Sequence, residues 1–250
     1  NTESYDSYTK LMLHMEGSGN NFVDSAASKA VTTNGDVTQT TSQYKLGSRS
    51  TVFNGSGDYL SLADSDDWNF GSGDFTIDFW VRLNAQPAAG LAFTICSQYK
   101  TATPDRAFQF DYLDVGGTKY LRFFYSPDGT LGTGVSLSVA QTLSNNTWYH
   151  IALVRNGANL MFFVDGTQSG ASQNISTDTI FSSAAQFMIG GVNETAPTNY
   201  FNGWLDEFRI SKGIARWTSN FTPPSSPYGK VATVTSLKKF GTASGEFHGS

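Results

Sequence analysis

Polar and aromatic side chains recur at every second position in three stretches of this chain. The residues are Asp78, Trp80, Arg82, Gln109, Asp111, Arg122 and Phe124. Residues two apart share one face of a β-strand. An aromatic ring can cover the C–H surface of a sugar, while carboxylate, amide and guanidinium groups hydrogen-bond its hydroxyls. This set predicts a carbohydrate-binding face, unless its acids and arginines pair across strands and a loop covers Trp80.

Strands must position these groups. Residues 74–83 alternate strictly between apolar and polar side chains, which is the pattern of a strand with one face on a core. Shorter alternations over 108–112 and 121–125 flank a hairpin loop at 114–118. Further strands are predicted over 148–155, 159–165, 186–190 and 204–210, and one helical turn over 211–217.

The apolar face of these strands predicts the core. Trp148 and Trp204 also stand among apolar neighbours, and we expect them in the core as well. The residues that alternation assigns to the core are Phe75, Ile77, Phe79, Val81, Phe110, Phe123 and Phe208.

Composition favours an all-β domain. Only 15% of the residues are charged and 14% are aromatic, whereas long surface helices need Lys, Glu and Ala. No amphipathic helix of ordinary length is visible, and strands do not alternate with helices. The expected fold class is therefore an all-β, two-sheet antiparallel β-sandwich.

The bulk numbers also exclude several classes of protein. A net charge of −5 without a basic stripe argues against a nucleic-acid partner. No stretch approaches the ~20 apolar residues of a membrane-spanning helix. The single cysteine, Cys96, rules out an intrachain disulfide, and its apolar neighbours predict a buried thiol.

Four motifs occur in a fixed order along the chain. They are Phe53-Asn-Gly-Ser-Gly-Asp-Tyr-Leu60, Gly73-Asp-Phe-Thr-Ile-Asp-Phe-Trp-Val81, Trp148-Tyr-His-Ile-Ala-Leu-Val-Arg155 and Gly203-Trp-Leu-Asp-Glu-Phe-Arg-Ile210. With them, about residues 8–225 resemble the laminin-G-like jelly rolls of the concanavalin A-like lectin and glucanase superfamily. The resemblance implies a jelly-roll sandwich. Modules similar to this one occur, often in tandem, in bacterial extracellular proteins and bacteriophage structural proteins.

The resemblance also implies a structural calcium ion. Many relatives hold one between the loop after the first strand and the last strand, and the matching positions here are Glu16, Asp24 and Asp206. Calcium takes six to eight oxygen ligands, which carboxylates and backbone carbonyls supply. The alternative is that Asp206 caps a turn or pairs with Arg209.

Catalysis finds little support. The related glucanases carry Glu-x-Asp-x-Glu on one strand, which brings three carboxylates to one face for glycoside hydrolysis. This chain has no such triplet. Asp206 and Glu207 are adjacent, so a regular strand would direct them to opposite faces. We expect no enzymatic activity.

The end of the chain echoes an earlier segment. Residues 231–250 align without a gap with residues 37–56, with 9 identities in 20 positions, and such an echo is typical of tandem domains. The predicted organisation is one jelly-roll domain over 1–222, a proline-rich linker over 223–230, and the start of a second, truncated repeat over 231–250. The tail is expected to pair with a sheet edge of its own domain or another chain through Val231, Val234, Phe240 and Phe247.

Together these patterns favour a non-catalytic, lectin-like or adhesive module of a larger extracellular or virion-surface protein. Its partners would be a glycan or neighbouring protein subunits, with self-association through the tail as a further expectation. Two alternatives stay open: a purely structural module such as a bacteriophage decoration or fibre domain, and a degenerate glycoside hydrolase.

Overall fold

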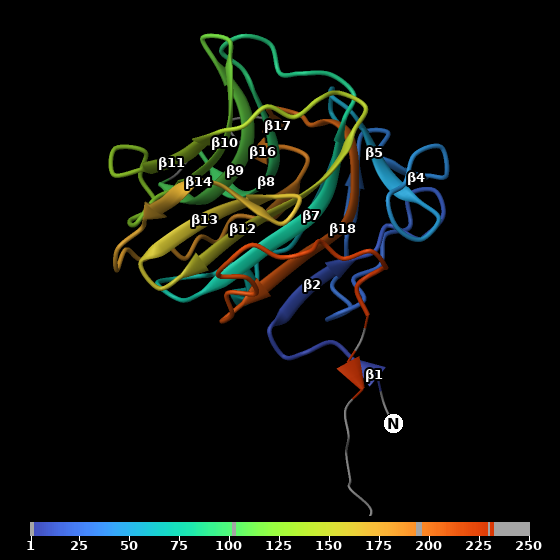
Figure 1. Cartoon of the computed structure of the whole chain (residues 1–250), viewed down its shortest axis with the longest axis horizontal. Helices are drawn as coiled ribbons and strands as arrows, with labels where there is room; N and C mark the ends of the chain where they lie inside the picture. Colours follow the sequence, from blue (N-terminus) through green and yellow to red (C-terminus); the bar gives the residue numbers. More distant parts are fainter. Residues whose placement is uncertain (1–2, 102–103, 194–196, 230, 233–250) are drawn as a thin grey trace, which may run out of the picture.

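Two antiparallel sheets pack face to face in this protein (Figure 1). The computed structural model describes residues 3–101, 104–193, 197–229 and 231–232. Phe79 of one sheet meets Phe110 of the other with ring centroids 5.8 Å apart, so the apolar faces of both sheets form one core. The predicted two-sheet β-sandwich is confirmed.

The first sheet has nine strands, and its antiparallel path begins with two hairpins. Gly116 and Gly117 turn the β9–β10 hairpin at φ values of +60° and +88°, where residues with a side chain would be strained. In spatial order the strands are β11 (Val135–Ala140), β10 (Thr118–Tyr125), β9 (Asp105–Val115), β8 (Ala92–Lys100), β15 (Phe187–Ile189), β6 (Tyr59–Leu62) and β3 (Thr32–Asn34). Off this path, β16 (Val192–Asn193) pairs with β8, and β17 (Pro197–Thr198) pairs with β16.

The second sheet has eight strands and contains the strictly alternating segment, β7, near its centre. In spatial order the strands are β14 (Thr167–Asn174), β13 (Asn159–Val164), β12 (Trp148–Asn156), β7 (Phe75–Leu83), β18 (Asn202–Lys212), β5 (Ser50–Asn54) and β4 (Thr38–Thr40), with β2 (Thr9–Leu13) paired to β18. Among the described residues the single short helix, η1, spans Asp66–Trp68, and no helix is long and apolar enough to cross a lipid bilayer.

The core follows the alternation of the sequence. All seven residues that alternation assigned to it are buried, with exposed fractions of 0–1%. Cys96 is also buried, as its neighbours predict. Trp148 and Trp204 are different, because both are only half-buried. They stand on the outer face, one position out of phase with the core residues Ile151 and Leu205.

A β-bulge interrupts β18, the longest strand of the second sheet. The register with β7 shifts between Asp206 and Arg209, and Glu207 adopts a φ of +50°. Before the bulge β18 pairs with β5, and after it with β2. The bulge therefore lets one strand serve two neighbours in succession.

The chain after β18 crosses the outer face of the second sheet as a strap, residues 213–228 (Figure 1). The helical turn predicted over 211–217 is absent, because β18 continues to Lys212 and irregular chain follows. The rings of Trp217 and Phe221 stack at 4.0 Å and pack on an apolar patch of β12 and β13. Within the predicted linker 223–230, Tyr228 is 7% exposed and its amide donates to Glu207, so this residue docks on the sandwich; the division of the chain into domain, linker and second repeat stays a prediction.

The strap ends beside the start of the chain. Strand β19 (Val231–Ala232) pairs antiparallel with β1 (Glu3–Ser4), which Figure 1 shows below the sandwich. This pair is a separate two-stranded ribbon and not an edge of either sheet of the sandwich, so pairing of the tail with a sheet edge stays a prediction. The other three tail residues predicted to pair, Val234, Phe240 and Phe247, lie outside the described residues, and the truncated second repeat stays a prediction.

Replacing Phe79 by Ala tests the shared core. The side chain is fully buried between rings of both sheets, so its loss should lower the free energy of unfolding by about 3–5 kcal/mol. Urea denaturation measures this value. The matched control is Val23→Ala, a 58% exposed position, where we expect a change within about 0.5 kcal/mol. A loss below about 1 kcal/mol for Phe79→Ala would contradict the assignment of faces.

Two truncations separate the strap from the tail. Of the pairing that the structure describes, a chain that ends at Gly229 loses the short β1–β19 pair, which is marginal by itself, and this chain should melt like the full chain. A chain that ends at Thr222 loses Tyr228, and its free energy of unfolding should be roughly 2–4 kcal/mol lower, because Glu207 loses its backbone hydrogen-bond partner. Equal stability of both truncations would contradict a structural strap. Sizing the full chain against the first truncation tests self-association through the tail.

Candidate functional site

The outer face of the second sheet holds the first three predicted ligand residues, and two of them are committed to internal contacts. Asp78 is fully buried and accepts two hydrogen bonds from the Arg209 guanidinium, both 2.9 Å long. His150 lies 3.6 Å from the same carboxylate. Burial would raise the pKa of Asp78, but the Arg209 charge and the His150 contact lower it below its usual range. Asp78 is therefore half of an internal ion pair between neighbouring strands.

Trp80 is also committed to contacts within the protein. It is 5% exposed and touches the His150 ring edge to face. The Lys45 ammonium lies over its indole, 4.3 Å from the ring centroid. The strap closes over this part of the sheet, because the Tyr228 hydroxyl meets His150 Nε2 at 2.9 Å. A sugar cannot stack on the indole face that Lys45 occupies.

Arg82 belongs to a more open row at the end of the same face. It lies opposite Trp148 on β12 and Trp204 on β18, and its guanidinium is 5.0 Å from the centroid of the Trp204 ring. One Arg82 nitrogen donates to Asn146 Oδ1 at 2.6 Å. Both tryptophans were predicted to be core residues. Counting in steps of two from the core residues Ile151 and Leu205 puts both tryptophans on the outer face, where the structure has them.

The other three predicted ligand residues lie on the outer face of the first sheet. Asp111 is fully buried and faces Arg122 across the β9–β10 ladder, with a shortest nitrogen–oxygen distance of 2.5 Å. Thr94 donates to the same carboxylate, and so does Gln109, which is 6% exposed. Burial raises the pKa of Asp111, while Arg122 and these hydrogen bonds oppose the rise.

The six predicted ligand residues therefore do not form one site. Alternation was right that they avoid the core, but Asp78, Trp80 and Arg82 lie on one sheet and Gln109, Asp111 and Arg122 on the other. A sandwich has two outer faces, and alternation cannot tell which of them a strand contributes to. The acid–arginine pairs Asp78–Arg209 and Asp111–Arg122 follow the cross-strand pairing that was the alternative interpretation.

An open groove adjoins Arg122 on the first sheet. Its volume is about 310 Å³. Arg122 is 27% exposed here, and Tyr120 is half-buried beside it. On the neighbouring strand β11, Ser138 lies opposite Arg122 and Ser136 opposite Phe124, and both serines are exposed. The groove combines an aromatic ring, a fixed guanidinium and two hydroxyls; its remaining lining residues are Leu113 and Val115.

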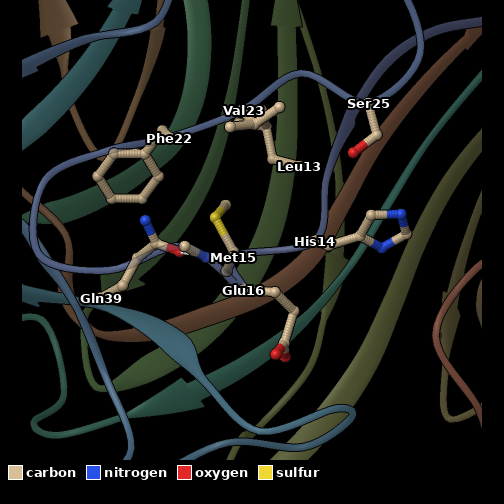
Figure 2. A pocket seen from close by; sticks show the side chains of 9 residues that line it. Leu13, His14, Met15, Glu16, Phe22, Val23, Ser25 and Gln39 are labelled. Atoms are coloured by element: carbon tan, nitrogen blue, oxygen red, sulfur yellow. Dashed lines mark hydrogen bonds between the residues drawn. The ribbon is translucent and has the colours of Figure 1, made fainter.

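The three residues expected to bind calcium are each committed to other partners, although Glu16 and Asp206 hold the same loop, residues 45–49. Asp24 accepts hydrogen bonds from four backbone amides, those of Met12, Ala26, Ala27 and Lys29. Glu16 accepts three from Ser48 and Arg49. A pocket beside β2 is lined by Glu16 but not by Asp24 or Asp206, and in Figure 2 the Glu16 carboxylate points away from Phe22 and Val23.

Of the three carboxylates, Asp206 alone has an oxygen without a hydrogen-bond partner among the described residues. Its Oδ2 accepts from the amides of Lys45 and Leu46 at 2.8 and 2.9 Å, and its buried Oδ1 has no partner. Among the described residues no group of three or more His, Cys, Asp or Glu side chains could hold a metal ion. The trio does not fit one shared calcium ion; each carboxylate anchors a loop instead. Calcium binding stays a prediction.

The adjacent pair Asp206 and Glu207 also differs from expectation. The bulge breaks alternation, so both carboxylates lie on the outer side of the sheet and the prediction of opposite faces is wrong. Both residues are fully buried. Glu207 accepts from His14 Nδ1 at 2.7 Å and from the Tyr228 amide at 2.8 Å. Two carboxylates shielded from solvent in this way cannot reach a glycosidic bond.

The pH dependence of stability tests the state of Asp206. Burial raises its pKa to about 7, against the two backbone hydrogen bonds and with help from the charges of Glu207 and Glu16. In the unfolded chain this proton is released near the ordinary aspartate pKa of 3.8. Between these values the folded state binds more protons, so this group lowers the unfolding free energy as pH rises.

Asp206→Asn removes that dependence. Relative to the wild type, the variant should gain roughly 2–4 kcal/mol of unfolding free energy between about pH 4 and about pH 8, measured in urea. A constant difference would contradict the raised pKa. Repeating the titration with calcium and with EGTA tests the metal: calcium held by ionised Asp206 would stabilise the wild type and not the variant.

The fold itself is shared with known proteins. The binding domain of Paraclostridial Mosquitocidal Protein 1 is 16% identical, with a TM-score of 0.63, and the match covers 83% of this chain and 49% of that one. Botulinum neurotoxin type C, whose cell entry depends on two ganglioside molecules, is 16% identical with a TM-score of 0.61, and the match covers 83% of this chain and 48% of that one. The binding domain of botulinum neurotoxin DC in complex with rat synaptotagmin II is 15% identical with a TM-score of 0.61, and the match covers 84% of this chain and 50% of that one.

This chain spans about half the length of those structures, and identities of this size show the fold alone. None of the curated protein sequences matches the chain significantly. A family match extends over residues 54–216, which is more than half of the chain and runs from the end of β5 into the strap. The chain therefore belongs to the concanavalin A-like lectin/glucanases superfamily.

Proposed function

We propose that this domain is a non-catalytic carbohydrate-binding module and that its glycan lies in the groove beside Arg122. The observation that carries the proposal is the fixed guanidinium. Asp111 accepts from Arg122 Nε and Nη2, which holds the side chain in place. A guanidinium has five N–H donors, so three are left for sugar hydroxyls.

The neighbours of Arg122 complete a sugar-sized surface. The half-buried Tyr120 ring can stack on the C–H face of a pyranose, and the hydroxyls of Ser136 and Ser138 can donate or accept. Because Asp111 is already neutralised by Arg122, a ligand does not have to bury an unpaired charge.

The absence of catalysis is part of the proposal. The six residues that line the groove include no carboxylate, and Asp111 is buried behind Arg122. Glycoside hydrolysis needs two carboxyl groups that flank the scissile bond. We infer an extracellular setting, on a secreted or a virion-surface protein, since lectin-type modules act on glycans outside the cell.

A glycan array tests the proposal. The full chain should bind a defined subset of glycans, and Tyr120→Ala should weaken that binding by about tenfold, the loss expected for one stacked ring. Tyr44→Ala is the matched control, because Tyr44 is an exposed tyrosine on another part of the molecule. Arg122 itself is a poor variant, since its removal would leave Asp111 buried and unpaired.

Two outcomes would contradict this function. Silence of the array would favour a structural module with protein partners, and binding unaffected by Tyr120→Ala would place the glycan elsewhere. An arm with EGTA shows whether calcium takes part. Release of reducing sugar from any bound polysaccharide would instead indicate a glycoside hydrolase.

A further inference from the structure

A second pocket lies on the opposite sheet, where the strap leaves the outer face partly open. Its volume is about 340 Å³. Lys45, Trp80, Trp148 and Asp165 form its floor and sides, and strap residues 223–225 close one wall. The pocket shares no residue with the groove beside Arg122, so it is independent of the function proposed above.

Lys45 brings an ammonium group to this pocket without a carboxylate partner. Its backbone amide is fixed by Asp206 at 2.8 Å, and its Nζ lies 4.3 Å from the centroid of the Trp80 ring. Among the described residues no Asp or Glu forms an ion pair with Lys45. The ring holds the charge in place but accepts none of its three N–H donors as a carboxylate would.

Asp165 brings one acceptor to the other side. It begins the Asp165-Gly166 turn, where φ values of +48° and +74° match a two-residue hairpin turn. Its Oδ1 accepts from the His150 amide at 2.8 Å, which orients the carboxylate. Oδ2 is left to accept from a ligand, because Asp165 is exposed and no hydrogen bond to Oδ2 is present.

The remaining walls are apolar and rigid. Trp148 is half-buried, and Pro223 and Pro224 have fixed backbones. A simple anion would satisfy Lys45 but would leave these walls unused and would be repelled by Asp165. A neutral sugar would use the walls and Asp165 but would leave the ammonium without an anionic partner.

We propose that this pocket binds a sugar residue that carries a carboxylate, such as a hexuronic or sialic acid within a glycan. The ligand carboxylate pairs with Lys45 Nζ, a hydroxyl donates to Asp165 Oδ2, and the C–H face of the ring packs on Trp148 and the prolines. Trp80 acts as a positioning residue that holds the ammonium.

Titration of the full chain with D-glucuronic acid, followed by saturation-transfer NMR, tests the proposal. We expect saturable binding that weakens with salt and that Lys45→Gln or Trp148→Ala weakens by about tenfold or more. D-Glucose, which lacks the carboxylate, and inorganic phosphate, which lacks the ring, should each bind about tenfold more weakly than glucuronic acid.

Lys100→Gln is the matched control. It removes the same charge from an exposed position on the other sheet and should leave binding unchanged. Tyr120→Ala should also leave it unchanged, whereas dependence on Tyr120 would place the acid in the other groove and overturn the proposal. So would the absence of saturable binding, or equal binding of glucose or phosphate. Melting curves of each variant show whether a loss of binding follows from unfolding.

Discussion

The bulge in β18 is the constraint on which the rest of the second sheet depends. By adding one residue between Asp206 and Arg209, it brings two carboxylates to the same side of the strand. Asp206 then holds the backbone of Lys45, and Glu207 holds the backbone of Tyr228. One local irregularity thus fixes the loop and the strap that together form a pocket. The left-handed conformation of Glu207 costs free energy, and the contacts on both sides offset it.

The alternation of apolar and polar residues is enough to predict the fold and its core, but it is not enough to predict which residues meet in a binding site. Phe75, Phe79 and Val81 could be placed in the core because a period of two needs only one buried face. Whether Asp78 and Asp111 share an outer face depends on which sheet each strand joins, and that is decided by pairing between distant segments. The outward position of Trp148 could have been predicted, because Trp148 stands three residues before the core residue Ile151 and so falls on the opposite face of the strand. The prediction from its apolar neighbours was wrong, because the composition of a segment does not tell which face of the strand a residue occupies.

The strap shows a second limit of local patterns. Prolines 223 and 224 remove backbone donors, which is typical of a linker, and nothing in the segment itself reveals a partner. Its docking depends on groups far away in sequence: Gly166 accepts from the Phe221 amide, and Glu207 accepts from the Tyr228 amide. A large aromatic residue, Tyr228, directly after the proline-rich stretch is the one signal in this segment that could have pointed to docking on the sandwich.

Because β1 and β19 pair with each other, both ends of the described chain leave the domain at one pole. Mechanical tension between the segments that precede and follow the domain would act on the two outermost paired residues, Glu3 and Ala232. Such a pull opens an antiparallel pair one residue at a time, like a zipper, instead of shearing all its hydrogen bonds together. The sandwich lies beside this line of force, so a stretched chain would yield at this pole before the load reaches β7 and the two proposed binding sites.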